Sequence, residues 1–263
     1  MDVSVILVSY NTKDLTRNCL NSIYEKTKDI EFEVFVVDNN SHDGSPEMVE
    51  QEFPQVKLIR NLDNKGFGAA NNIAIKQSNA KYIFCLNTDT LLLDNSIKTF
   101  FDYMEKEENK KVGACGGYLS NNNEYCISYG SLPSFKEILC RFFKLNYICY
   151  PDNSIEKSFP VGYISGADIF LRKNLLEEIG SFDEDFFMYY EDTDLCARIL
   201  KNNYNNIILP YVNIIHLESK STKNNNKKIT MMKKSEKLYH KKHSNILLQL
   251  LINVHTYLKY KIK

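Results

Sequence analysis

Four short apolar runs in the first ninety residues constrain the fold most strongly. They are rich in Val, Ile and Phe, they are near-continuous rather than alternating, and they cover residues 3–8, 33–37, 56–59 and 82–86. Strands that are buried on both faces have this character. The segments between the runs carry apolar residues at helical spacing. Alternation of this kind predicts an α/β fold with a parallel, doubly wound sheet.

Polar residues directly follow three of the four predicted strands. They include Ser9, Tyr10 and Asn11 after the first strand, Asp38 at the end of the second, and Asn87 and Asp89 after the fourth. In an open parallel sheet, the loops at the carboxyl ends of the strands form the ligand site. We therefore expect these residues to lie together at one edge of the sheet.

Asp89 and His216 are candidate metal ligands. A hard divalent ion that bridges two phosphates needs one or two protein oxygens and takes its other ligands from phosphate and water. Asp89 is suitably placed for this, although turn formation also explains an acid after a strand. His216 follows an apolar run at 207–215. A lone histidine beside apolar residues is more often structural, but this one could complete the same site.

Two further segments are suited to a nucleotide. An acid in the position of Asp38 can accept hydrogen bonds from a base or a ribose, although turn chemistry accounts for the segment equally well. Gly66 opens a predicted helix, and helix N-termini favour phosphate. The segment is not a dinucleotide fingerprint, because Asn71 stands where a third glycine is required. Close helix packing is the competing interpretation.

The most distinctive local feature is a cluster of three carboxylates, Glu191, Asp192 and Asp194, preceded by five bulky residues. Adjacent acids repel one another and partial burial desolvates them, so both effects raise a carboxylate's pKa toward useful base strength. The alternative is an acidic first turn that the helix dipole stabilises. A predicted helix over about 191–202 accommodates either interpretation. Before it, we expect loops and short strands over about 112–170, a strand over 164–171 and a helix over 173–179 that ends at Gly180.

The C-terminal region is basic although the whole chain has a net charge of zero. From Lys227 onward there are ten lysines and one acid, and an apolar stripe follows a polar, Lys/Asn-rich connection near Lys220. We expect a basic amphipathic helical tail over 223–263. Such a helix can lie on an anionic membrane, or its stripe can pack on the preceding domain or on a second subunit as a homodimer. No nucleic-acid motif accompanies the lysines, so no nucleic-acid partner is expected.

Cysteine usage and hydropathy suggest a compartment. The seven cysteines form no C-x-x-C pair, which suits a reducing environment. The N-terminal segment lacks the basic region of a signal peptide, and no run of about 18 apolar residues is present. These features predict a cytoplasmic protein, and if the tail lies on a membrane, that membrane would be the inner face of the plasma membrane.

Taken together, these segments resemble the inverting nucleotide-sugar glycosyltransferases of family 2, particularly the rhamnosyltransferase-like branch. The matching landmarks cover about residues 3–222. In chain order they are VSVILVSYN, VFVVDNNSHDGS, RNLDNKGFGAANN, FCLNTDT, ISGADIFLRK, GSFDEDFFMYYEDTDLCARI and IIHLESKS. Their joint order and spacing are far more specific than any single motif.

The resemblance implies a GT-A fold over residues 1–222, followed by the helical tail over 223–263. It also assigns roles to residues. The nucleotide would be held by Ser9, Tyr10, Asn11, Asp38, Asn64, Gly66, Asn71 and Asn87. A divalent Mg²⁺ or Mn²⁺ would be held by Asp89 and His216. The base would be Asp192, with Glu191 beside it, and the sugar or acceptor would meet Gly166, Ala167 and Asp194. Many relatives have Asp where this chain has Asn87, but Asn is usual in the rhamnosyltransferase-like branch.

The implied reaction is transfer of a sugar, with rhamnose from dTDP-rhamnose as the first expectation, to a saccharide or lipid-linked saccharide in cell-surface polysaccharide synthesis. Two alternatives stay open. A sugar nucleotidyltransferase would usually carry a glycine-rich basic loop after the first strand, which is absent here. A non-catalytic nucleotide-sugar or saccharide-binding relative would usually lack a base or a metal ligand.

Overall fold

The four predicted strands form one parallel block in the computed structural model, which describes residues 1–121, 124–133, 156–217 and 225–243. These strands are β1 (Val3–Ser9), β2 (Phe32–Asp38), β3 (Lys57–Arg60) and β4 (Tyr82–Asn87). They lie in the order β3-β2-β1-β4, and each adjacent pair is parallel. The parallel sheet that the apolar runs predicted is therefore confirmed.

Beyond β4 the sheet continues with strands of mixed direction, in the order β4-β11-β6-β12-β5, with β7 on β6 and β9 on β12. Their bounds are β5 (Thr90–Leu92), β6 (Val112–Asn121), β7 (Glu124–Cys126), β9 (Phe159–Val161), β11 (Asp168–Arg172) and β12 (Asn205–His216). β11 is antiparallel to both neighbours, so β6 and β12 again run in the direction of β4. A separate two-stranded sheet pairs β8 (Tyr129–Gly130) with β10 (Tyr163–Ile164).

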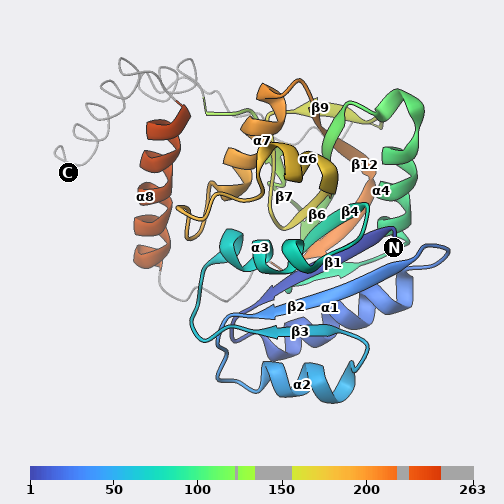
Figure 1. Ribbon diagram of the computed structural model, residues 1–263, viewed down its shortest axis with the longest axis vertical. Coiled ribbons are helices and arrows are strands. Elements are labelled where there is room, and N and C mark those ends of the chain that lie inside the picture. The colour runs from blue at the N-terminus through green and yellow to red at the C-terminus, as the bar shows by residue number, and fades with distance from the viewer. Residues whose placement is uncertain (122–123, 134–155, 218–224, 244–263) are drawn as a thin grey trace.

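Helices cover both faces of the large sheet (Figure 1). One face carries α1 (Lys13–Lys26), α2 (Ser45–Glu52) and α4 (Ser96–Glu105), followed by the short 3-10 helix η1 (Glu107–Asn109). The other carries α3 (Phe67–Gln77), α6 (Lys173–Ile179) and α7 (Glu191–Lys201). Alternate residues of β1 serve the two cores: Val5 and Leu7 pack on the first face and Ile6 on the second. The result is a three-layer α/β/α sandwich.

Two expectations for the middle of the chain were wrong. A continuous strand was predicted over 164–171, but the residues between Ile164 and Asp168 form a turn that separates β10 from β11. Gly166 sits in this turn, where a Cβ would approach the Phe67 ring to 2.8 Å. The region from residue 112 was expected to be irregular, yet β6 is a regular ten-residue strand. Its glycines suit close packing, since a Cβ at Gly113 would approach Ile199 and Leu175 to 2.7 Å.

The C-terminal helix α8 (Asn225–His243) stands outside the sandwich and lies beside α7 and the loop before it (Figure 1). It begins two residues into the predicted tail over 223–263, so the presence of a C-terminal helix is confirmed. Buried Tyr239 packs in a small apolar cluster with Phe186 and Ala197. The apolar stripe predicted farther along lies outside the described residues. No helix in the described part of the chain is both long enough and apolar enough to cross a bilayer.

The strand register brings the polar loops to one edge. Ser9 lies opposite Asp38 on β2, and Val8 lies opposite Asn87 on β4. The ends of β2 and β4 therefore flank the end of β1, as expected for the ligand edge of a parallel sheet.

Gly66 and Gly44 form a matched pair of glycines that tests how closely the backbone around Phe187 approaches Gly66. Both have left-handed φ, at 83° and 81°. A Cβ on Gly66 would lie 2.1 Å from the Phe187 carbonyl oxygen, whereas one on Gly44 would meet only the Lys13 side chain, at 3.3 Å. We expect Gly44→Ala to cost about 1–2 kcal/mol through its backbone alone. Gly66→Ala should cost more than about 3 kcal/mol, because strain and a backbone clash add. Urea unfolding measures both, and equal losses would contradict the close approach.

Candidate active site

The loop after β1 and the end of β2 form the first part of the site. Tyr10 is half-exposed, so its ring is available to a ligand. Asp38 is buried, and its Oδ2 accepts a hydrogen bond from the Ser41 N–H at 2.8 Å. Its Oδ1 is also buried but has no hydrogen-bond partner in the described structure. A buried acceptor without a donor is costly, so Asp38 is suited to receive an N–H or O–H from a bound molecule.

Asn11 joins this loop to the one that follows β2. Its φ is 54°, a left-handed value that Asn tolerates better than most residues. Its N–H donates to Ser41 Oγ and its Oδ1 accepts from the His42 N–H, both at 2.8 Å. Buried Ser9 contacts the Thr12 hydroxyl at 3.2 Å. Asn11 and Ser9 therefore shape the edge, while Tyr10 is presented at its surface.

The start of α3 is packed rather than open. Asn64 Oδ1 accepts from the Gly66 N–H at 2.9 Å, and the Phe67 N–H donates to the Phe187 carbonyl at 3.0 Å. Asn71 is fully buried, and its side-chain amide donates to the Phe67 carbonyl at 3.0 Å. The first helical N–H groups that a phosphate would use are thus partly occupied by the protein, which agrees with the packing interpretation of this segment.

Asp89 and His216 lie together at the end of β4. They come from distant parts of the chain because β5 pairs with β12, which sets Thr90 opposite His216. Asp89 Oδ1 is 3.3 Å from His216 Nε2, and both side chains are mostly buried. The Asp89 carbonyl also accepts from the Leu217 N–H at 2.9 Å. Asn87 ends β4 two residues before Asp89, and its backbone N–H donates to the Ala167 carbonyl at 3.0 Å.

This pair fits a divalent ion that shares its ligands with a bound phosphate. A carboxylate oxygen and an imidazole nitrogen converge on one point, and both are ligands that Mn²⁺ accepts. The described residues contain no group of three or more metal-ligating side chains. Asp89 and His216 alone would leave the other coordination positions to phosphate oxygens and water, as is usual for ions of this kind.

Asp192 is held against the turn that leads into β11. Its Oδ2 accepts from the Gly166 N–H at 2.9 Å, and its Oδ1 accepts from the Thr193 N–H at 2.6 Å. Gly166 precedes Ala167, whose carbonyl is bonded to the end of β4. The turn that interrupts the predicted strand therefore connects the carboxylate of Asp192 directly to the strand that carries the loop of Asp89.

The two adjacent acids differ in their environments. Burial raises the pKa of Glu191 well above its ordinary value, and the neighbouring charge of Asp192 raises it further. Glu191 Oε2 is buried and has no hydrogen-bond partner in the described structure. Burial also raises the pKa of Asp192, but hydrogen bonds from Gly166 and Thr193 oppose this increase. Glu191 therefore holds a proton more readily, and Asp192 is the acid that is suited to be ionised.

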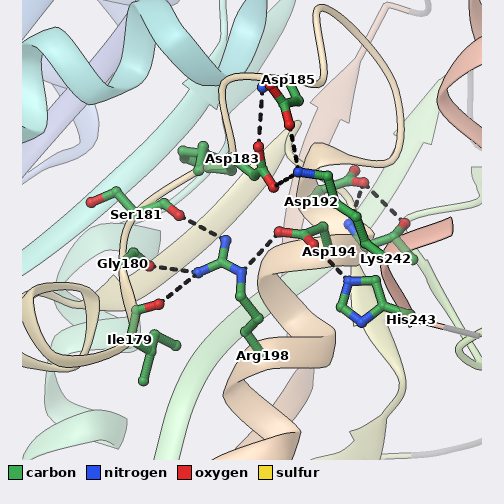
Figure 2. A network of polar contacts seen from close by, with 12 residues as sticks. Ile179, Gly180, Ser181, Asp183, Asp185, Asp192, Asp194, Arg198, Lys242 and His243 are labelled. Atoms are coloured by element: carbon green, nitrogen blue, oxygen red, sulfur yellow. Dashed lines mark hydrogen bonds and ion pairs between the residues drawn. The ribbon is translucent and has the colours of Figure 1, made fainter. Parts of the chain in front are cut away.

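Asp194 is deeply buried, and both of its carboxylate oxygens are engaged (Figure 2). Oδ2 accepts from Arg198 Nε at 2.9 Å, and Oδ1 lies 2.6 Å from His243 Nε2. Burial pushes the pKa of Asp194 upward, but His243 and Arg198 outweigh it and hold the pKa below its usual value. This arrangement suits an orienting role better than direct contact with an acceptor.

Several residues of the site were not found from the sequence. Asp168 is fully buried at the start of β11, where Oδ2 accepts from the Gly117 N–H at 2.7 Å and burial raises its pKa well above the ordinary value. An acid directly before an apolar run was a signal for it. His243 and Arg198 had no such signal, because only the folded chain shows that they share Asp194.

Sequence comparison places the chain among enzymes that transfer sugars. Residues 4–180 match the family described as glycosyl transferase family 2. The N-acetylglucosaminyl-diphospho-decaprenol L-rhamnosyltransferase of Mycobacterium tuberculosis is 28% identical over 209 residues, which are 72% of this chain and 67% of that protein. Rhamnosyltransferase WbbL of Escherichia coli is 24% identical over 205 residues, 75% of this chain and 76% of that one.

Structural comparison agrees on the fold. The mannosyltransferase PcManGT from Pyrobaculum calidifontis, solved in complex with GDP-Man and Mn²⁺, superposes with a TM-score of 0.61 at 18% identity, covering 96% of this chain and 73% of that one. Asp192, His216 and α8 lie beyond the residues that the family match covers. The matched segment is more than half of the chain and contains β1–β4 and the β11 strand. This protein belongs to glycosyl transferase family 2, is of the rhamnosyltransferase-like type and has the GT-A fold.

Proposed function

We propose that this glycosyltransferase moves a sugar from a nucleoside diphosphate donor onto an acceptor hydroxyl, with inversion at the anomeric carbon and with Asp192 as the base. The observation that carries the proposal is the state of the two adjacent acids. Asp192 is partly exposed and its ionised form accepts three hydrogen bonds, whereas Glu191 is buried and favours its neutral form. A pair whose pKa values are pushed apart is a common basis for acid and base assignment.

In the proposed reaction, Asp192 accepts the proton of the acceptor hydroxyl while the hydroxyl oxygen attacks the anomeric carbon. The bond from that carbon to the diphosphate oxygen breaks on the opposite face. The nucleoside diphosphate leaves with the electron pair, and Asp192 later releases the proton to solvent. One displacement gives the inverted glycoside, so a second carboxylate nucleophile is unnecessary.

The donor would be held by the loops at the ends of β1 and β2. The exposed Tyr10 ring is suited to stack on a base, and the unpartnered Asp38 Oδ1 is suited to accept an N–H from it. Asn87 would lie along the path of the diphosphate toward Asp89. Ser9, Asn11, Asn64, Gly66 and Asn71 would act mainly by holding this edge in shape, given the contacts that they make within the protein.

Asp89 and His216 would hold Mg²⁺ or Mn²⁺, whose positive charge neutralises a departing diphosphate when the ion is bound. The solved relative with GDP-Man and Mn²⁺ supports a metal and a nucleotide sugar. Two relatives named as rhamnosyltransferases support rhamnose from dTDP-rhamnose as the donor sugar. One of those names includes N-acetylglucosaminyl-diphospho-decaprenol, which supports a lipid-linked saccharide as the acceptor in cell-surface polysaccharide synthesis.

A lipid-linked acceptor would place the enzyme at the inner face of the plasma membrane. The outward face of α8 supports such a position, because it carries a row of exposed lysines at 233, 234, 237 and 241 while the other face packs on the protein. Anionic lipid attracts basic residues by about 1 kcal/mol for each lysine near the surface. We propose that this row, hereafter the α8 lysine row, contacts the bilayer.

The Asp192→Asn variant tests the base. Sugar transfer should fall by at least about 100-fold while donor binding survives, because Asn cannot accept the proton.

The wild-type rate should also fall as the pH is lowered through the raised pKa of Asp192. The acidic limb of the pH–rate profile should therefore lie above the ordinary aspartate pKa of about 3.9. A panel of dTDP-rhamnose, UDP-galactose, UDP-glucose and UDP-N-acetylhexosamine measures transfer and hydrolysis. The exposed Asp102→Asn variant is the control. Full activity of Asp192→Asn would exclude Asp192 as the base.

The Asp89→Asn and His216→Ala variants test the metal ligands. Titration calorimetry of the donor with Mn²⁺ should show at least about tenfold weaker binding in each variant, since each variant loses one of the two proposed protein ligands. EDTA should weaken the wild type to a similar level, whereas Asp102→Asn should bind like the wild type. If EDTA and both substitutions leave the donor affinity unchanged, Asp89 and His216 are not ligands of a metal that holds the donor.

Replacing the α8 lysine row by glutamine tests the membrane surface. The affinity for phosphatidylglycerol vesicles, measured by co-sedimentation, should fall by about tenfold or more. The binding that remains should depend less on salt. A variant with four other exposed lysines replaced, at 28, 76, 106 and 201, changes the total charge equally and should retain more binding. Equal losses in the two variants would show that net charge, rather than this face, attracts the vesicle.

A further inference from the structure

Helix α8 contacts the segment that leads into the catalytic acids at several successive points. Ser235 Oγ donates to the Met188 carbonyl at 2.7 Å, and the Tyr239 ring lies 5.6 Å from that of Tyr190. Lys242 Nζ lies 2.6 Å from a carboxylate oxygen of both Asp183 and Asp185 (Figure 2). These contacts run along the helix, so α8 lies across the whole segment from residue 183 to 194.

The segment beneath α8 is conformationally strained. Tyr189 and Tyr190 have successive left-handed φ values of 69° and 70°, and Glu191 follows immediately. A bulky residue in this region is disfavoured, and two in succession persist only when their surroundings fix them. Met188, one residue earlier, is bonded to α8, and Tyr190 packs on it. The surroundings that fix this turn therefore include α8.

The last described residue of α8 reaches the first turn of α7. His243 Nε2 lies 2.6 Å from Asp194 Oδ1, and its ring stacks on Tyr239 with centroids 4.6 Å apart. A carboxylate oxygen can only accept, so beside ionised Asp194 the imidazole takes the form that carries a proton on Nε2 and donates this hydrogen bond. The other oxygen of Asp194 accepts from Arg198, whose guanidinium also donates to the carbonyls of Ile179, Gly180 and Ser181.

Asp194 lies two residues after Asp192, and it links α7 to the end of α6 and to α8. Through Arg198 it is tied to the end of α6, and through His243 it is tied to α8 (Figure 2). A shift of the first turn of α7 would move Asp192 away from the Gly166 N–H. Catalysis by a positioned base is sensitive to displacements of this kind.

We propose that His243 is a positioning residue, and that α8 is a strap that holds the strained turn and the first turn of α7 so that Asp192 meets the acceptor hydroxyl. This inference rests on the proposed role of Asp192 as the base. It assigns a function to the C-terminal helix that differs from membrane contact, and it uses the opposite face of that helix.

The experiment compares His243→Ala, His243→Gln and Met232→Ala in the full chain. Met232 is an exposed residue of α8 and serves as the matched control. With a soluble acceptor, His243→Ala should lower kcat by about tenfold and leave the donor KM within about twofold, because the loops that hold the donor are not touched. His243→Gln should recover most of kcat, since its amide can donate to Asp194. A loss of donor binding equal to the loss of kcat would overturn the proposal, because it would indicate general disruption.

Hydrogen exchange measured by mass spectrometry tests the strap without any catalytic assay. His243→Ala should speed exchange in peptides covering residues 186–196 by at least about fivefold, with Met232→Ala matching the wild type. Unchanged exchange in His243→Ala would overturn the strap whatever the activity is. If the wild type transfers no sugar while exchange responds as expected, the proposed function fails and the contact of α8 with this segment stands.

Discussion

The hydrogen bond from the Gly166 amide to Asp192 depends on a single interruption of the chain. Residues 165–167 leave the two-stranded sheet and enter β11, and this turn faces the first turn of α7 on one side and the end of β4 on the other. β11 is the strand that runs against the parallel block. Its first residue therefore lies at the same edge where β1, β2 and β4 end. A parallel strand in this position would begin at the opposite edge and could not present the Gly166 amide to the base.

Much of this fold could be predicted from local composition. Near-continuous apolar runs identify buried strands, and their order along the chain limits a parallel sheet to few arrangements. The helix over 173–179 and its glycine terminator follow from the same rules. Segments whose structure depends on distant partners could not be predicted in this way. The 165–167 turn is set by packing against Phe67 and bonding to Asp192, and nothing in its own sequence requires an interruption.

Some residues of the site could likewise be predicted from the sequence, and others could not. Asp38, Asp89 and Asp192 stand out in the sequence because each acid follows or precedes an apolar run, and the register then brings strand ends together. Asn71 shows the limit of this reasoning, since its spacing does not reveal that its side-chain amide donates to the Phe67 carbonyl while its buried Oδ1 has no partner in the described structure. Arg198 and His243 show the converse. Their role depends on sharing one carboxylate, which is a property of three-dimensional proximity and not of spacing.

The acidic cluster illustrates how one short sequence gives three carboxyl groups different states. All three lie within the first turn of α7, so the helix dipole acts on each of them in the same direction. The differences between them must come from their specific partners. Glu191 Oε2 has none in the described structure, and Asp192 accepts from backbone N–H groups and a hydroxyl. Asp194 is bonded to the side chains of Arg198 and His243. Burial raises the pKa of Glu191 most, and the charge of Asp192 beside it raises that pKa further. Glu191, whose buried Oε2 has no donor among the described residues, is the acid that keeps its proton, and its neutral state lets Asp192 carry a negative charge beside it.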